Sequence, residues 1–216
     1  MTGPMTMNRV IHAAVRRDLL RLSTALSDWQ DGDCARGVEL ERAFANLHAE
    51  LHHHHEGEDT HIWPMLASVG VDPLLLAEME SEHAAMAEAL AATSTALGTL
   101  AGTGSAADAA AARASVGRTR QVVERHLRHE EEELEPQLAP HHGSPEWKAV
   151  EKNLRSRSPG DAGRFFAWLT DGIPRRELTF LRSAVPPPVI FVLARVLGRR
   201  YTRDIAPLWG ASTSRR

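Results

Sequence analysis

The stretch LHHHHEGEDTHIWPML, residues 51–66, places five imidazoles and three carboxylates in the middle of an apolar segment. His54 and Glu58 are four residues apart, so a helix presents them on one face. That face also carries Leu51 and Ile62, which indicates that it points toward a core. A charged carboxylate is costly to bury in such a stripe unless it is paired or binds a metal. The stretch therefore predicts a helix with a polar pair directed inward.

Three further segments show helical periodicity, and no segment alternates with period two over a useful length. Asn8 is the expected cap of the first helix, the third runs from about Pro73 to Leu100, and the fourth begins near Ala106. This pattern predicts an all-α fold, an antiparallel up-down four-helix bundle with short connections. The predicted core faces are His12, Val15, Leu19, Leu22 and Leu26 in the first helix, Leu76, Met79, His83, Met86, Leu90 and Leu97 in the third, and Val122, His126, Glu130, Leu134 and Leu138 in the fourth.

The chain contains an internal repeat of two helix pairs. The first and third helices carry matching histidines, His12 and His83, at an offset of 71 residues. The second and fourth share His-x-x-x-Glu followed by proline, at an offset of 72 residues: His54, Glu58 and Pro64 match His126, Glu130 and Pro136. Two such pairs, packed about an approximate two-fold axis, bring four histidines and two glutamates together from four helices.

This donor set predicts a metal site. Its ligands are nitrogen and oxygen without sulfur: His12, His54, Glu58, His83, His126 and Glu130. Imidazole suits iron, zinc, copper and nickel, carboxylate suits harder ions, and a mixed set shared between helices fits a carboxylate-bridged metal pair. His55 is a candidate for a supporting role only. His61 and His129 lie one to two turns from the proposed ligands and are candidates for additional or outer ligands.

Four motifs in this order resemble the hemerythrin-like, or HHE cation-binding, family over roughly residues 8–140. They are His12, the segment EDTHIWP after His54, ESEHAAM around His83, and EEEELEP after His126. The resemblance implies a four-helix bundle that holds a non-haem di-iron centre. It implies that His12 and His54 bind one iron and that His83 and His126 bind the other. Glu58 and Glu130 would bridge the two iron ions together with an oxo or hydroxo group.

The sequence departs from the invertebrate oxygen carriers of that family at two places. Their second histidine of the third helix is absent, because the positions four residues from His83 are Met79 and Ala87. Their helix-four aspartate corresponds to Glu131, which makes Glu131 the alternative bridge to Glu130. With two histidines for each iron, both ions would keep an open position unless His61, His129 or water fills one. Two open positions would suit bridging peroxide, nitric oxide or redox turnover.

Charge divides the chain into two parts. Residues 1–143 hold 11 Lys and Arg against 22 Asp and Glu, whereas residues 144–216 hold 14 against 6. We expect a hemerythrin-like domain over 1–143 and a basic, aromatic-containing helical extension over 144–216. The extension either packs on the acidic helices and completes their core, or binds an acidic partner or an anionic surface.

The remaining features concern the cellular compartment. Cys34 is the only cysteine, which excludes an intrachain disulfide and a Cys-based zinc cluster. The start of the chain has no apolar segment of signal-peptide length, and the longest apolar run, 189–197, is too short to span a bilayer. The sequence therefore predicts a cytoplasmic protein without a membrane span.

These features favour a di-iron protein that binds or reacts with dioxygen, peroxide or nitric oxide. The expected pocket is dry and lined by Leu19, Leu51, Met86 and Leu90. The alternative function is an iron, oxygen or redox sensor whose extension contacts a protein partner. A dinuclear zinc or manganese hydrolase is less favoured, because no substrate-orienting serine, arginine pair or phosphate loop accompanies the ligands. No nucleic-acid partner is expected, since no recognition motif is present.

Overall fold

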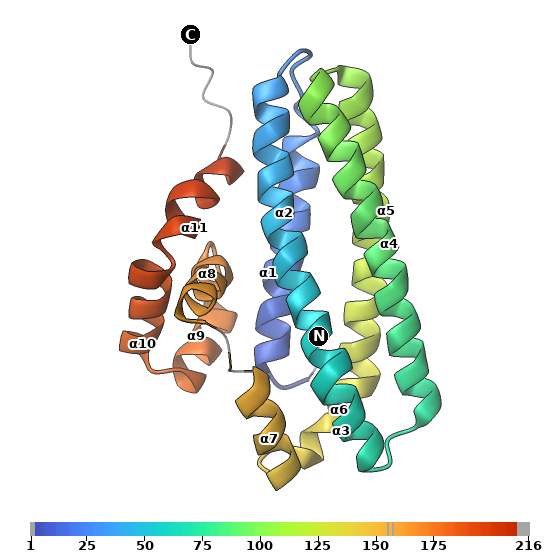
Figure 1. Cartoon of the computed structure of the whole chain (residues 1–216), viewed down its shortest axis with the longest axis vertical. Coiled ribbons are helices and arrows are strands. Elements are labelled where there is room, and N and C mark those ends of the chain that lie inside the picture. The colour runs from blue at the N-terminus through green and yellow to red at the C-terminus, as the bar shows by residue number, and fades with distance from the viewer. Residues whose placement is uncertain (1–2, 155, 157, 211–216) are drawn as a thin grey trace.

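Four long helices lie side by side in the computed structural model, which describes residues 3–154, 156 and 158–210. They are α1 (Met7–Ala25), α2 (Cys34–Gly57), α4 (Pro73–Thr103) and α5 (Ala106–His129). α1 contacts α2 and α5, and α4 contacts the same two helices. Consecutive long helices are joined at alternating ends (Figure 1). No strand occurs among the described residues, so the prediction of an all-helical fold is confirmed.

Short polar side chains begin these helices. The hydroxyl of Thr6 accepts a hydrogen bond from the backbone N–H of Arg9 and caps α1, so the prediction of Asn8 as the cap is wrong. Asn8 is the second residue of α1, and its side-chain amide donates to Glu130 Oε1 at 2.9 Å. Thr6 meets the capping requirement two residues earlier, which leaves Asn8 to contact η2 and α6. The other three long helices begin after Asp33, Asp72 and Ser105, whose side chains accept from backbone N–H groups.

The second and fourth long helices each continue through a π-helical turn. η1 (Glu58–Ile62) leads into α3 (Trp63–Ser68), and η2 (Glu130–Leu134) leads into α6 (Glu135–Leu138). The Trp63 N–H donates to the Glu58 carbonyl, and the Glu135 N–H donates to the Glu130 carbonyl, five residues back in each case. Pro64 follows Trp63 and has no N–H to continue the α-helical ladder. The repeat seen in the sequence therefore reappears in the backbone, and each π turn begins at a glutamate of the predicted metal site.

The predicted seams form the core. All five named positions of α1 and all six of α4 are buried, from His12 to Leu26 and from Leu76 to Leu97. On α5 the register differs slightly, because Val123 is buried in the core and Val122 is only half-buried. A second, separate apolar cluster contains Trp63 and Leu134. The metal-site residues His12, Glu58 and Glu130 are thus placed on buried helix faces, as the periodicity requires.

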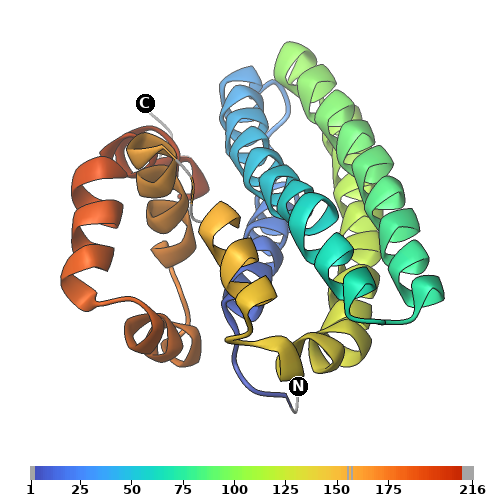
Figure 2. The ribbon, with the colours of Figure 1, turned by 60° about the horizontal axis from the view of Figure 1, so that its bottom comes forward.

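Residues after α6 form a series of short helices. They are η3 (Ala139–His141), α7 (Pro145–Leu154), α8 (Pro159–Thr170), α9 (Arg175–Ala184), α10 (Pro187–Phe191), η4 (Val192–Leu197), α11 (Arg199–Asp204) and η5 (Ala206–Trp209). The group from α8 to η5 lies beside α1 and α2, on the side away from α4 and α5, whereas α7 lies near the end of the long helices (Figures 1 and 2). α8 and α9 contact α1, and η5 contacts α2.

A buried carboxylate attaches this group to α1. Asp18 is fully buried, and its side chain accepts hydrogen bonds from Trp168 Nε1 at 2.8 Å and from Arg17 Nε at 2.8 Å. Trp168 and Tyr201 share one apolar core with residues of α1 and α2. Arg21 also pairs with Asp171 at 2.8 Å. These two aromatic side chains therefore pack against the long helices.

No single described helix is long and apolar enough to cross a membrane. α9 together with the α10–η4 segment reaches that length and composition only as a pair, and the pair is bent by 112°.

Candidate metal centre

The structure brings the six predicted donor residues to one place between the four long helices. His12 lies on α1, His54 on α2, Glu58 at the start of η1, His83 on α4, His126 on α5 and Glu130 at the start of η2. Five of these side chains are buried, and the side chain of His54 is 10% exposed. Their role as ligands stays a prediction, but their convergence matches the geometry that the repeat requires.

The four imidazoles form two pairs through their Nε2 atoms. The Nε2 atoms of His12 and His54 are 3.3 Å apart, and those of His83 and His126 are 3.2 Å apart. Glu58 spans both pairs, because its Oε1 lies 3.2 Å from His54 Nε2 and its Oε2 lies 3.6 Å from His83 Nε2. One carboxylate group therefore faces donors of both imidazole pairs.

Glu130 spans the same two pairs from the opposite helix. Its Oε2 lies 3.2 Å from His12 Nε2 and 3.9 Å from His126 Nε2. Neither Glu130 Oε2 nor Glu58 Oε2 makes a hydrogen bond, although both atoms are buried. Leaving a buried acceptor unsatisfied costs about 1–3 kcal/mol, and more for a charged group. A bound cation would offset this cost, so the donors fit metal ions better than they fit a solely structural network.

His55 is a further candidate metal ligand, although sequence analysis gave it a supporting role only. It is 8% exposed, its ring stacks on His83 with centroids 4.1 Å apart, and its Nε2 has no hydrogen-bond partner. One ligand atom each from His55, His83 and His126 lies within 4.8 Å of the others, and the same holds for His12, His54 and Glu130. A single residue step turns a helix by about 100°, so neighbouring histidines face different partners. The run of four histidines was the signal, but periodicity alone favoured His54.

Carboxylates outside the centre hold three of the imidazoles. In each case a carboxylate oxygen lies within hydrogen-bond distance of the Nδ1 atom of a histidine, and the Nε2 atom of that histidine points to the centre. This arrangement is common around metal ligands. The pairs are His12 with Glu131 at 2.8 Å, His83 with Asp59 at 2.8 Å, and His126 with Glu82 at 3.0 Å. Sequence analysis did not single out Asp59, which is exposed, or Glu82, which is half-buried, because no spacing rule links either carboxylate to a histidine on another helix.

The remaining candidates lie outside the cluster of donors. Glu131, the alternative bridge, contacts the outer nitrogen of His12 and accepts from Arg16 Nη1 at 2.7 Å. His129 faces Glu82 through its Nδ1 at 3.1 Å, and His61 is half-buried. Neither His61 nor His129 belongs to the groups of converging metal donors among the described residues. The structure therefore places Glu130, rather than Glu131, between the imidazole pairs.

A comparison with protein families decides the family. The family model of the hemerythrin HHE cation binding domain matches residues 7–138 of this chain. This chain belongs to the hemerythrin HHE cation-binding family. The match contains all six predicted donors and agrees with the resemblance expected over residues 8–140. Searches of the curated proteins and of the solved structures gave no match.

Burial and charge set opposite pKa shifts in this hemerythrin-family site. Burial lowers the pKa of His12, but the charges of Glu130 and Glu131 and the contact of Glu131 with Nδ1 outweigh it and raise the pKa to about 8. Burial lowers the pKa of His54 to about 3 and that of His55 well below its usual value. Burial raises the pKa of Glu58, with a further rise from the nearby Glu130 charge. The lowered pKa values of His54 and His55 favour neutral imidazoles, and a neutral imidazole offers a lone pair to a cation.

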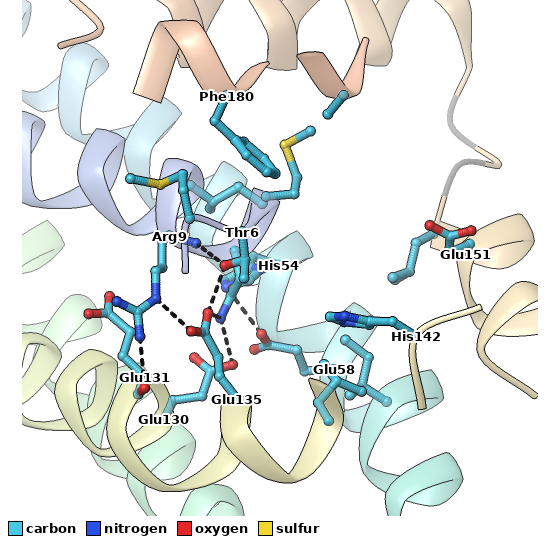
Figure 3. A pocket seen from close by; sticks show the side chains of 18 of the residues that line it. Thr6, Arg9, His54, Glu58, Glu130, Glu131, Glu135, His142, Glu151 and Phe180 are labelled. Carbon is cyan, nitrogen blue, oxygen red and sulfur yellow. Dashed lines mark hydrogen bonds and ion pairs between the residues drawn. The ribbon is translucent and has the colours of Figure 1, made fainter. Parts of the chain in front are cut away.

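A cavity of about 1720 Å³ opens beside one side of the site of this HHE domain. His54, Glu58 and Glu130 line it, whereas His55, His83 and His126 do not. Figure 3 shows the first three side chains together, with Phe180 of α9 pointing into the cavity from the other wall. Met5, Met7, Phe165 and Phe166 add further apolar surface. The residues expected to form a pocket, Leu19, Leu51, Met86 and Leu90, are instead buried in the core and do not line this cavity.

Proposed function

We propose that this hemerythrin-family protein binds two iron ions and that the pair binds or reacts with a small oxidant or gas: dioxygen, peroxide or nitric oxide. One observation carries the proposal: two buried carboxylates, Glu58 and Glu130, each lie between the two imidazole pairs. The Oε2 atom of each carboxylate makes no hydrogen bond. The four long helices would form the antiparallel up-down bundle of the family. Imidazole nitrogen and carboxylate oxygen together suit iron.

The proposed ligand set is unequal for the two ions. His12 and His54 would hold one ion, and His83 and His126 would hold the other together with His55. Glu58 and Glu130 would lie between the ions. A pair of iron ions with an oxo or hydroxo bridge supplies electrons and open coordination positions, which the protein side chains lack. With His55 in the set, we expect only one ion to keep an open position, instead of the two expected from ligand counting on the sequence.

The cavity supports access from one direction. It reaches His54, Glu58 and Glu130, which are donors on the His12–His54 side or shared between the ions. Phe165, Phe166 and Phe180 make part of its wall apolar, which suits small uncharged molecules. Arg9 and Arg16 near this opening are held by ion pairs with Glu135 and Glu131 at 2.6 and 2.7 Å. The open position would therefore face the cavity.

The outer carboxylates would orient the imidazoles. Glu131, Asp59 and Glu82 fix the rings of His12, His83 and His126 through Nδ1 and keep each Nε2 directed at the centre. Such contacts raise the basicity of a ligating imidazole and select its tautomer. Removal of one outer partner from a metal site typically weakens metal affinity by roughly 10–100-fold.

The first experiment is to purify the chain without added metal, measure iron per chain, and record visible spectra before and after adding peroxide, dioxygen or nitric oxide. We expect two irons and a spectrum that responds to at least one of these ligands. A colourless protein that holds zinc would contradict the proposal and favour the dinuclear hydrolase. A chain that binds iron but gives no response to any of the three would retain the metal site and refute the reaction.

A substitution at the shared carboxylate tests the ligand assignment. Glu58→Ala should lose the second iron and the near-ultraviolet ligand-to-iron absorption, and metal retention should fall roughly 10-fold or more, since even an outer partner is worth that much. Glu56→Ala is the matched control, because Glu56 lies on the same helix with a side chain that is 60% exposed. Full retention of two irons and of the absorption band in the Glu58→Ala protein would refute the assignment.

A further inference from the structure

The α10–η4 segment exposes an apolar face. Among the described residues, eight large apolar side chains are exposed, and five of them lie within the nine residues from 189 to 197. Val189, Phe191, Val192 and Val196 are 44%, 62%, 47% and 50% exposed, and we call these four the outer face. Val189, Val192 and Val196 are three and four residues apart and share one side of the helix. A contiguous exposed apolar face on a folded chain commonly marks an interaction surface.

The opposite side of the α10–η4 segment packs closely on α8, and the outer face stays exposed in the part of the chain that the structure describes. Ile190 and Ala194 are buried, and η4 contacts α8. The approach is so close that a Cβ atom at Gly163 of α8 would lie 2.5 Å from the Leu197 carbonyl carbon. α10 lies at the edge of the molecule farthest from α4 and α5 (Figures 1 and 2). The outer face is therefore held in a fixed orientation, directed away from the long helices.

Positive charge surrounds the outer face. Arg195 lies within the segment, and Arg199 follows one turn later; both side chains are exposed. Neither they nor Arg182 of α9 form an ion pair or a side-chain hydrogen bond with any residue that the structure describes. Two carboxylates of the same region are already paired, Asp171 with Arg21 and Asp204 with Arg203, and Glu177 of α9 has a buried Oε2 that makes no hydrogen bond. Residues 144–216 as a whole hold 14 basic against 6 acidic side chains.

We propose that the outer face of α10–η4, flanked by Arg195 and Arg199, docks this protein on the surface of an anionic lipid bilayer. An amphipathic helix with valine and phenylalanine on one side and arginine beside them lies in the interface, its apolar face buried about 5–10 Å deep. Such binding needs two signals, buried apolar area and electrostatic attraction, and this segment supplies both. The 112° bend between α9 and α10–η4 suits a segment that lies on the surface rather than crossing it.

Other partners fit the surface less well. Nucleic acid would favour arginines with stacking aromatic side chains and polar contacts, whereas three of the four side chains of the outer face are valines. An acidic protein partner could pair with the arginines, but it would also need an apolar surface shaped to fit the outer face. A lipid surface needs no such match, because acyl chains accept any apolar side chain and anionic headgroups accept any arginine.

The experiment is a flotation assay of the full iron-loaded chain with vesicles of phosphatidylcholine alone or mixed in equal parts with phosphatidylglycerol. We expect binding to the anionic vesicles, little binding to the neutral ones, and weaker binding at high salt because of screening. Val192→Ser with Val196→Ser should weaken binding about tenfold or more. Arg195→Gln and Arg199→Gln should each weaken it about fivefold. Iron content and far-ultraviolet circular dichroism should stay at the values of the unaltered chain.

Matched controls are available elsewhere on the chain. Leu74→Ser removes an apolar side chain of α4 that is 73% exposed, and Arg118→Gln removes an exposed arginine of α5. Both should bind vesicles as the unaltered chain does. No binding to anionic vesicles, equal binding to neutral ones, or equal loss in the controls would overturn the proposal. So would a dimer that the Val192→Ser, Val196→Ser change converts to a monomer, or duplex DNA binding that the change leaves intact.

Discussion

Two neighbouring histidines of α2 face different parts of the candidate metal centre. His54 lies against His12 across the helix interface, whereas His55 stacks on His83 and approaches His126. The motif His-x-x-x-Glu identifies His54, because four residues separate it from Glu58. No spacing rule identifies His55, since its role depends on how α4 and α5 are placed around α2. Its burial and its unpartnered Nε2 became evident only in three dimensions.

Removal of His55 tests its place in the site. His55→Ala should weaken retention of one of the two irons roughly 10-fold or more, because it removes one of three imidazoles that converge on the same side. The measurement is competition for iron against a chelator, followed by iron per chain. His53→Ala is the control, since the His53 side chain is 50% exposed. Chelator curves for His55→Ala that coincide with those of His53→Ala would show that His55 only packs.

His12 makes the stability of the metal-free chain depend on pH. Its pKa is raised from 6.5 to about 8 by Glu130 and Glu131 acting against burial. A raised pKa in the folded state means that the stabilisation is fully present below pH 6.5 and is lost as the pH rises through about 8. The difference corresponds to about 2 kcal/mol. His54 acts in the opposite sense, because its pKa is lowered to about 3: the unfolded chain binds a proton there from about pH 6.5 downward and the folded chain does not, so acidification destabilises the fold.

Urea unfolding of the metal-free chain at pH 6.5 and 8.5 would measure this effect. We expect His12 to contribute a fall of about 1.5 kcal/mol in the free energy of unfolding between the two pH values, measured as the difference in pH dependence between the unaltered chain and His12→Gln. The same pH dependence in the unaltered chain and in the His12→Gln chain would mean that Glu130 and Glu131 do not hold a charged His12.

The π turns explain how helix geometry presents the glutamates. η1 and η2 each begin at a glutamate of the centre, and a proline follows six residues later. Proline usually ends or kinks a helix, but at Pro64 the structure shows a widened turn that lets the helix continue into α3. The proline was recognisable, but whether the chain stops or widens depends on the packing of α3 against α4 and α7.

The contact between α8 and η4 depends on glycine. A Cβ at Gly163 would lie 2.6 Å from the Leu197 Cβ and 2.8 Å from the Gly198 backbone nitrogen. Gly163→Ala should therefore lower the free energy of unfolding by roughly 1–3 kcal/mol, the usual cost of overpacking. Gly160→Ala on the same helix is the control, because its nearest neighbour, Ser158 Oγ, is 3.9 Å away. Urea unfolding of the two variants measures the difference, and equal stability would show that the helices separate without cost.

The whole chain combines the metal-binding helices with the basic extension through a shared core. Trp168, Leu169 and Tyr201 pack in the same cluster as Val15 and Leu22. A chain that ends after Gly143 should keep its iron, because all six predicted donors lie within the family match of residues 7–138. It should unfold at a lower urea concentration, because Asp18 and the apolar side chains around it become exposed to solvent when Trp168 and Tyr201 are removed. A folded, truncated chain without iron would show instead that the extension completes the metal site.

Motif spacing and periodicity were sufficient to predict the all-helical fold, the buried seams and the six donors that converge, because each is a property of one helix or of a repeat along the chain. The place of His55, the outer carboxylates Asp59 and Glu82, and the cavity wall from α8 and α9 were decided by tertiary structure. Those features arise between elements far apart in sequence, where packing rather than local spacing sets which side chains meet.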